Sequence, residues 1–254
     1  MKKVIYPLAL IMATAAVLVG SAPLRASETD DRIETSFKKS YVYKTYLKDE
    51  QIKISSKDGA VTLSGDVRND THKPMAQDVV EALPGVKSVD NRIQITGDRP
   101  AENSDMWVSM KVKTALVFHR NVNAQKTEVY VKDGIVTLKG VAANQAQKDL
   151  TAEFAKDVGG VKGVNNEMTV AANPETPSET MGENIDDASI TAQVKMTLLL
   201  HGSTSVLRTK VETNDGVVTL AGQARNAAEK DLVTDINGVK SVVNNMTIEG
   251  SEKE

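Results

Sequence analysis

The side chains best suited to chemistry are three histidines, His72, His119 and His201, in a chain of 254 residues without cysteine. His119 and His201 each precede the glycine of an Asp-Gly pair by 15 residues, so they occupy equivalent positions. Such a pair suggests a metal ligand or a pH sensor. The alternative is a histidine at a helix C-terminus, where it interacts favourably with the helix dipole. We favour the second interpretation, because neither histidine has further ligand residues clustered around it.

Carboxylates and glycines form no catalytic arrangement either. Asp58, Asp133 and Asp215 each stand before a glycine, in separate segments and without an acidic partner. Turn formation explains them, because an Asp-Gly pair between alternating apolar runs is a hairpin signal. The glycines follow one strand and open another, so they do not form a phosphate-binding loop. We therefore expect no enzyme, no cofactor and no metal.

Two short patterns recur three times and define three homologous repeats. D-G-x-V-T-L-x-G begins at the three aspartates, and G-V-K-x-V follows at Gly85, Gly160 and Gly238. Asparagine follows each second pattern. We expect it to stabilise the local backbone conformation where the chain re-enters a sheet, because asparagine tolerates unusual dihedral angles. Nine glycines are expected to have structural roles: Gly59, Gly65, Gly85, Gly134, Gly140, Gly160, Gly216, Gly222 and Gly238.

Each repeat also contains two helical patterns. From the last glycine of the first motif to the first glycine of the second is 20 residues in repeats one and two and 16 in repeat three. The four missing residues correspond to about one turn of α-helix, which indicates a helix in this segment. Upstream of each hairpin, apolar residues recur at i, i+4 and i+8. These stripes are Ile33, Phe37, Tyr41; Val108, Val112, Leu116; and Ile190, Val194, Leu198. The patterns predict an α+β fold of three tandem α-β-β-α-β modules, each a three-stranded mixed sheet with two helices on one face.

Repeats one, two and three are predicted at residues 28–98, 104–171 and 185–250, with a linker at 172–184. The segment between repeats one and two is short, so we expect these two to pack as a pair. The second linker contains two prolines and three glutamates. It predicts that repeat three moves on a tether.

Residues 1–26 have the pattern of a secretory signal peptide, with two lysines, an apolar run and a small-residue exit. We expect cleavage near Ala26 and a periplasmic protein, and an uncleaved anchor stays open as the alternative. Cleavage leaves 28 basic and 34 acidic residues, a net charge of about −6. This charge argues against nucleic acid as a partner.

The order of elements and the two motifs resemble the BON domain family, named for bacterial osmotic-shock (OsmY) and nodulation proteins. Repeat three is the closest match, opening with I-T-A-Q-V-K from Ile190 and closing with V-V-N-N from Val242. A signal peptide before BON repeats resembles the periplasmic proteins of the OsmY group, which typically carry two copies, not three. The resemblance implies phospholipid or envelope association, stress protection and no known catalytic centre.

The first helix of repeat two has a second apolar face, which carries the chain's single tryptophan. Basic residues flank this face, and residues 104–171 contain nine basic and seven acidic residues. An apolar face with basic neighbours suits an anionic lipid surface. The rival interpretation is that this face packs against a neighbouring repeat. The lipid-binding candidates are Trp107, Met110, Lys111, Lys113, Val117, Phe118 and Arg120.

We therefore expect a non-enzymatic periplasmic protein that binds phospholipid or envelope surfaces under osmotic or envelope stress. The alternative is a chaperone-like or scaffolding protein that binds other exported polypeptides through sheet edges or apolar patches. Other envelope proteins are further candidate partners. A lipid binder should depend on anionic lipid and on Trp107, whereas a chaperone should bind unfolded protein regardless of lipid.

Overall fold

The computed structural model describes residues 23–97, 100–172, 185–201, 209–224 and 229–248. Most of the predicted signal peptide and of the predicted linker lies outside these residues. The first helix, α1, begins at Pro23 and thus includes the last four residues of the predicted signal segment. Cleavage near Ala26 stays a prediction.

Each repeat has the predicted order of elements. Repeat one consists of α1 (Pro23–Lys39), the π-helical turn η1 (Tyr43–Leu47), β1 (Gln51–Lys57), β2 (Ala60–Val67), α2 (His72–Glu81), β3 (Ser88–Asn91) and β4 (Gln94–Ile95). Repeat two consists of α3 (Asp105–Phe118), the 3-10 turn η2 (Ala124–Lys126), β5 (Thr127–Lys132), β6 (Ile135–Ala142), α4 (Gln145–Lys156), β7 (Gly163–Asn166) and β8 (Thr169–Val170). Repeat three consists of α5 (Asp187–Leu200), β9 (Thr209–Asn214), β10 (Val217–Ala224), α6 (Glu229–Thr234) and β11 (Ser241–Ile248).

The second strand of each repeat is the centre of a mixed sheet. β2 pairs antiparallel with β1 and parallel with β3 and β4, and β6 has the same relation to β5, β7 and β8. β10 pairs antiparallel with β9 and parallel with β11, which runs without a break. The predicted α+β fold is thus confirmed, with the third strand in two pieces in repeats one and two.

An aspartate of each first helix holds the Asp-Gly turn: Asp105 and Asp187 begin α3 and α5, whereas Asp30 lies inside α1. In repeat two, the Asp105 carboxylate accepts the backbone N–H groups of Asp133 and Gly134, both at 2.9 Å. Asp30 and Asp187 make the same pair of bonds in the other two repeats. These bonds, first the one from Gly134, hold the pKa of Asp105 below its usual value. This hydrogen-bonding role was not predicted from the sequence.

The G-V-K-x-V-x-N pattern closes each turn from the other side. The backbone N–H of its lysine donates to the turn glycine carbonyl, at 2.9 Å from Lys162 to Gly134. In repeat two, the Asn166 side chain then accepts the N–H of Met168 and donates to the Lys148 carbonyl on α4. These bonds confirm that the asparagine stabilises the local backbone. The bond from the lysine to the turn glycine explains why the two motifs occur together.

The nine glycines expected to be structural all have positive φ. Gly65 and Gly140 show the steric reason, because a Cβ atom there would lie 1.8 Å from the Gln51 carbonyl oxygen on β1 and 2.0 Å from the Lys126 carbonyl oxygen just before β5. No side chain fits at these two positions unless the hairpin opens.

The first-helix stripes are buried in repeats two and three, whereas repeat one differs at its third position. Ile33 and Phe37 are buried, but Tyr41 is only half-buried. α1 ends at Lys39, and η1 then turns the chain so that Val42 and Leu47 enter the core in place of Tyr41.

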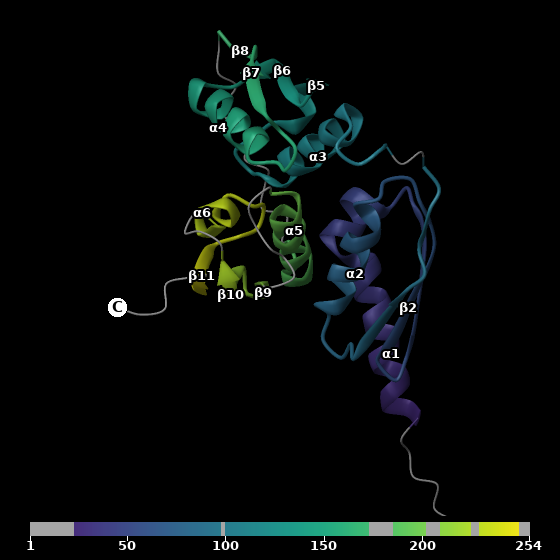
Figure 1. Cartoon of the computed structure of the whole chain (residues 1–254). Coiled ribbons are helices and arrows are strands. Elements are labelled where there is room, and N and C mark those ends of the chain that lie inside the picture. Colours follow the sequence, from purple (N-terminus) through teal and green to yellow (C-terminus); the bar gives the residue numbers. More distant parts are fainter. Residues whose placement is uncertain (1–22, 98–99, 173–184, 202–208, 225–228, 249–254) are drawn as a thin grey trace, which may run out of the picture.

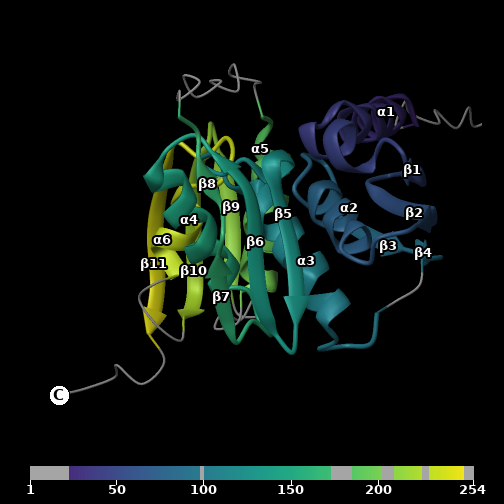
Figure 2. The ribbon, with the colours of Figure 1, turned by 90° about the horizontal axis from the view of Figure 1, so that it is seen from above.

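Helix α5 of repeat three lies between the other two repeats (Figure 1). One hydrophobic cluster joins Met75 of repeat one, Phe118 of repeat two and Met196 of repeat three. α2 packs on α5, and repeat two covers another side of α5 (Figure 1). Seen from above, repeat two overlies repeat three and repeat one stands beside them (Figure 2), while Figure 1 shows that helices of repeats two and three lie between their two sheets. The prediction that repeat three moves on a tether is therefore wrong, and repeat one packs α2 mainly on repeat three and not on repeat two.

Candidate functional site

The candidate lipid-binding residues lie on and just after α3, in three different environments. Ser104 caps this helix, and its Oγ accepts the N–H of Trp107 at 3.2 Å. One face of α3 enters the core of repeat two through Val108, Val112 and Leu116. The seven candidate residues are distributed over the remaining surface, where neighbouring repeats cover some of them.

Phe118 lies in the interface with repeat one. Its side chain is buried, and its ring meets that of Tyr46 edge to face, with centroids 5.6 Å apart. Such a ring pair contributes about 1 kcal/mol beyond the burial itself. Phe118 therefore stabilises the packing of the repeats and is not accessible to lipid in this structure.

Lys111 and Trp107 form a local pair beside the loop after α4. The Lys111 ammonium lies 3.7 Å from the centroid of the Trp107 ring and donates to the carbonyl oxygen of Gly159. Burial lowers the pKa of Lys111 from its ordinary value. Trp107 itself is half-buried. This lysine is thus committed to the ring and the loop and offers little charge to an external ligand.

Arg120 holds repeat three against repeat two. Its Nη2 donates to the carbonyl oxygens of Thr234 at 2.6 Å and Val239 at 2.7 Å. Its Nε lies 3.7 Å from the Asp235 carboxylate. Neutral acceptors and a carboxylate together satisfy this guanidinium, so Arg120 belongs to the interface between the repeats.

The interface between repeats two and three has approximate two-fold symmetry, and the two equivalent histidines mark it. His119 forms an antiparallel bridge with Ile236, and His201 forms one with Val158. His119 lies 3.9 Å from Asp235, and His201 lies 3.9 Å from Asp157. Both histidines are helix C-caps, as the sequence predicted. Their place in a shared interface was not predicted, although their equivalent positions were a signal for it.

Three candidates remain accessible on α3. Met110 is half-buried, Lys113 is exposed and Val117 is 38% exposed. Met106, one turn before Met110, is 69% exposed and belongs to the same stripe. The i, i+4 spacing of the two methionines could have identified Met106 from the sequence.

A second accessible apolar group lies on the face of the repeat two sheet that the helices leave open. Tyr130 of β5 is 54% exposed, and Ile135 and Val141 of β6 are 38% and 44% exposed. Lys132 pairs with Ile135 across the hairpin, and the Lys139 ammonium lies 5.7 Å from the centroid of the Tyr130 ring. We call these five residues the open sheet face. None of these five residues is among the binding residues predicted from the sequence.

The described part of the chain contains no group of three or more histidine, aspartate or glutamate side chains that could hold a metal ion. None of the described helices is both long and apolar enough to cross a membrane.

Several known proteins show similarity to this chain. The chain is 32% identical over 146 residues to osmotically-inducible protein Y of Escherichia coli strain K12, which covers 56% of this chain and 71% of that protein. It is 30% identical over 143 residues to outer membrane lipoprotein DolP of Haemophilus influenzae, covering 55% and 72%. A solved structure of CdsD, a structural protein of the type III secretion system of Chlamydia trachomatis, covers 86% of this chain and 90% of that chain at 16% identity, with a TM-score of 0.22. The family model described as BON domain matches residues 29–97, 104–172 and 186–250, and the chain therefore belongs to the BON domain family.

Proposed function

We propose that this BON-domain protein acts at the bacterial envelope without catalysis, and that it binds anionic phospholipid surfaces through repeat two. The names of two relatives, one osmotically inducible and one an outer membrane lipoprotein, support the envelope setting. The distribution of exposed apolar side chains carries the proposal for repeat two. Among the described residues, six of the eight large exposed apolar side chains belong to this repeat: Met106, Val117, Tyr130, Ile135, Val141 and Val170.

The open sheet face is the part of repeat two that differs most from its counterparts. Where this face has Tyr130, Ile135, Lys139 and Val141, the other repeats have mainly small, polar or acidic residues. The equivalents are Ser55, Ala60, Ser64 and Asp66 in repeat one, and Glu212, Val217, Ala221 and Gln223 in repeat three. A sheet face exposed to water normally carries such polar residues. The face also carries Glu128, which accepts a hydrogen bond from the Tyr130 hydroxyl and offsets one lysine charge. Three apolar side chains, with two lysines beside them, therefore support a mainly apolar contact with an anionic surface.

The chemistry of the open sheet face suits the headgroup boundary of a membrane. Tyrosine favours this region because its ring is apolar and its hydroxyl is polar. Lys132 and Lys139 are exposed and contribute about 1 kcal/mol each near an anionic surface. Glu167 lies 3.5 Å from Lys139 and offsets part of that charge. We therefore expect weak binding that falls with rising salt.

The accessible residues of α3 are the second candidate lipid contact, to be compared with the open sheet face. Three of the predicted α3 residues are still accessible to a ligand: Met110, Lys113 and Val117. The other four make contacts within the chain: Trp107, Lys111, Phe118 and Arg120. We accordingly assign the lipid contact to the open sheet face, and we keep the α3 residues as the alternative that the experiment distinguishes.

The test is co-sedimentation of the chain from Ser27 to Glu254 with phosphatidylglycerol-containing vesicles and with pure phosphatidylcholine vesicles, at low and high salt. We expect binding to the anionic vesicles only. Replacement of Tyr130→Ser together with Ile135→Ser should weaken it about tenfold, the effect of about 1.4 kcal/mol. Val243→Ser, on the repeat three sheet and 44% exposed, is the matched control and should bind as the wild type does.

Two outcomes contradict the proposal in different ways. If neither vesicle type binds the wild-type chain, the lipid function is wrong. If the double sheet variant binds normally while Met110→Ser or Lys113→Glu does not, lipid binding stands and its site returns to α3.

A further inference from the structure

A groove between the first helix and the edge strand occurs in both repeats two and three. Residues of this region in repeat three lie 82 positions after their repeat two equivalents. In repeat three, Thr191 and Lys195 of α5 and Val211 of β9 line the groove. In repeat two, Ser109 and Lys113 of α3 and Val129 of β5 line the corresponding groove, of about 530 Å³. We call this second space the α3–β5 groove.

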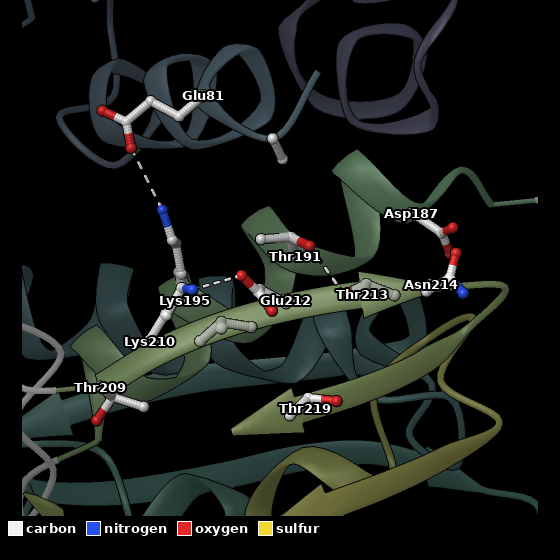
Figure 3. A pocket seen from close by; sticks show the side chains of 12 residues that line it. Glu81, Asp187, Thr191, Lys195, Thr209, Lys210, Glu212, Thr213, Asn214 and Thr219 are labelled. Carbon is white, nitrogen blue, oxygen red and sulfur yellow. Dashed lines mark hydrogen bonds and ion pairs between the residues drawn. The ribbon is translucent and has the colours of Figure 1, made fainter. Parts of the chain in front are cut away.

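The end of a helix of repeat one lines one side of the groove of repeat three. Glu81 and Ala82, at the C-terminal end of α2, line it from the side opposite β9. Lys195 points from α5 toward this helix (Figure 3), with its ammonium 3.0 Å from the Asp78 carboxylate and 3.3 Å from that of Glu81. The two acids stand three residues apart and thus project from the same side of α2. The chain itself therefore shows which partner this type of groove accepts.

Small residues allow α2 to lie close to α5. Ala188 and Ala192 are 7% and 0% exposed, and they belong to the hydrophobic cluster that includes Met75 and Ala76 of α2. The helix contact thus combines an apolar floor with one lysine that two carboxylates neutralise. Both parts are needed, because an ion pair near the surface alone contributes little.

The α3–β5 groove has the same parts but no helix over it. Met106 and Met110 stand where repeat three has Ala188 and Ala192, and Lys113 stands where it has Lys195. Lys113 is exposed, and no ion pair is found for it within the described residues. Asn69 is the single residue of repeat one that lines this groove. Methionine side chains are flexible and adapt to different apolar partners.

We propose that the α3–β5 groove docks an amphipathic helix of a partner protein, which carries two carboxylates one turn apart as Asp78 and Glu81 do on α2. The carboxylates pair with Lys113, and the apolar side of the helix covers Met106 and Met110. An added strand along β5 fits the groove less well, because Ser109 already donates to the Val129 carbonyl on that edge, at 3.4 Å. Tyr130 lines this groove and also belongs to the open sheet face, so the two proposed contacts share this one residue, whereas Lys113 belongs to the groove alone.

The chain supplies its own probe for this groove. A fluorescein-labelled peptide of residues 70–84, held helical by a side-chain cross-link, is titrated with the chain from Ser27 to Glu254 while fluorescence anisotropy is followed. The free peptide lacks the covalent connection that holds native α2 near its partner, so we expect weak binding, with a Kd of roughly 0.1–1 mM. Lys113→Glu should weaken binding about tenfold or more, since it replaces an attraction with a repulsion.

A charge exchange distinguishes specific docking from general stickiness. A peptide with Asp78→Lys and Glu81→Lys should bind poorly to the wild-type chain and regain binding to the Lys113→Glu chain. Lys38→Glu is the matched control, because Lys38 is the exposed equivalent in repeat one, where Asp31 and Thr35 stand in place of the methionines. This control should bind the original peptide as the wild type does.

The proposal is overturned by any of three results: no saturation of the wild-type chain at the expected concentrations, equal binding by Lys113→Glu, or no rescue by the exchanged peptide. Equal binding by Lys113→Glu would mean that the peptide instead enters another place, such as the α5 groove in competition with native α2. Vesicle binding of Lys113→Glu, measured in parallel, should be unchanged. Failure of the helix docking can therefore be told apart from failure of the lipid contact.

Discussion

His119 combines burial, aromatic stacking and an unsatisfied nitrogen within the interface of repeats two and three. Its ring stacks on Phe154 with centroids 3.5 Å apart, and its Nδ1 has no hydrogen-bond partner. Asp235 faces it at 3.9 Å and is itself paired with Arg120. Burial lowers the pKa of His119 from 6.5 to about 4. The folded protein therefore holds this imidazole neutral over a range in which the unfolded chain protonates it.

We predict that the free energy of unfolding falls as the pH falls from about 6.5 toward 4. In this range the unfolded chain binds the additional proton, so acid favours unfolding by up to about 3 kcal/mol. Burial raises the pKa of Asp235, and this group has the opposite sign, which reduces the loss near the acidic end. Urea denaturation at a series of pH values measures the slope. His119→Phe, which keeps the stacking on Phe154, should flatten it, and an unchanged slope in that variant would contradict the assignment.

At the scale of elements, α3 and α5 show how the same kind of helix can meet different neighbours. Eleven of the fourteen residues of α5 are buried, because its own sheet, α2 and repeat two enclose it. α3 is enclosed only in part, and Phe118 is covered whereas its neighbour Val117 is 38% exposed. The position of a residue around α3 therefore decides whether it stabilises the fold or remains available for binding.

We predict very different costs for truncating these two neighbouring residues. Phe118→Ala should lower the free energy of unfolding by about 3–5 kcal/mol, because it leaves a cavity beneath Tyr46. Val117→Ala, the matched control, should change it by less than about 1 kcal/mol, since its side chain already contacts water. Equilibrium denaturation measures both values. Equal small effects would mean that Phe118 is exposed in solution, and the lipid interpretation of this residue would then regain support.

The sequence was sufficient for what depends on local spacing. Motifs such as D-G-x-V-T-L-x-G predict hairpins, and i, i+4 stripes such as Val108 and Val112 predict buried helix faces, because the turn and the core lie within one repeat. The sequence does not show which of the remaining helix faces are covered by a neighbouring repeat. Lys111 and Lys113 stand on one helix with similar sequence surroundings, yet Gly159 accepts a bond from the first while the second stays exposed. That difference arises from the docking of whole repeats, for which the sequence has no short-range signal.

At the scale of the molecule, repeats two and three are joined by backbone hydrogen bonds of the kind that otherwise pair neighbouring strands. Asn237 donates its N–H to Phe118 and Gly159 donates its N–H to Leu200, both at 2.9 Å and at related places in the approximate two-fold arrangement. The main hydrophobic cluster includes residues from all three repeats. Repeats of this size are marginally stable alone, so the shared packing is needed for the stability of each.

We predict that the three repeats unfold in one cooperative transition. Trp107 fluorescence reports on repeat two and far-UV circular dichroism reports on the whole chain, so the two urea curves should coincide. Arg120→Ala should shift both curves together, lowering the free energy of unfolding by about 1.5–3 kcal/mol, because two carbonyl oxygens lose a charged donor. Arg92→Ala, which breaks only an exposed pair with Asp90, is the control and should cost less than about 1 kcal/mol. Curves that separate already in the wild type would mean that the repeats unfold independently, and the interface at Arg120 would then be too weak to couple them.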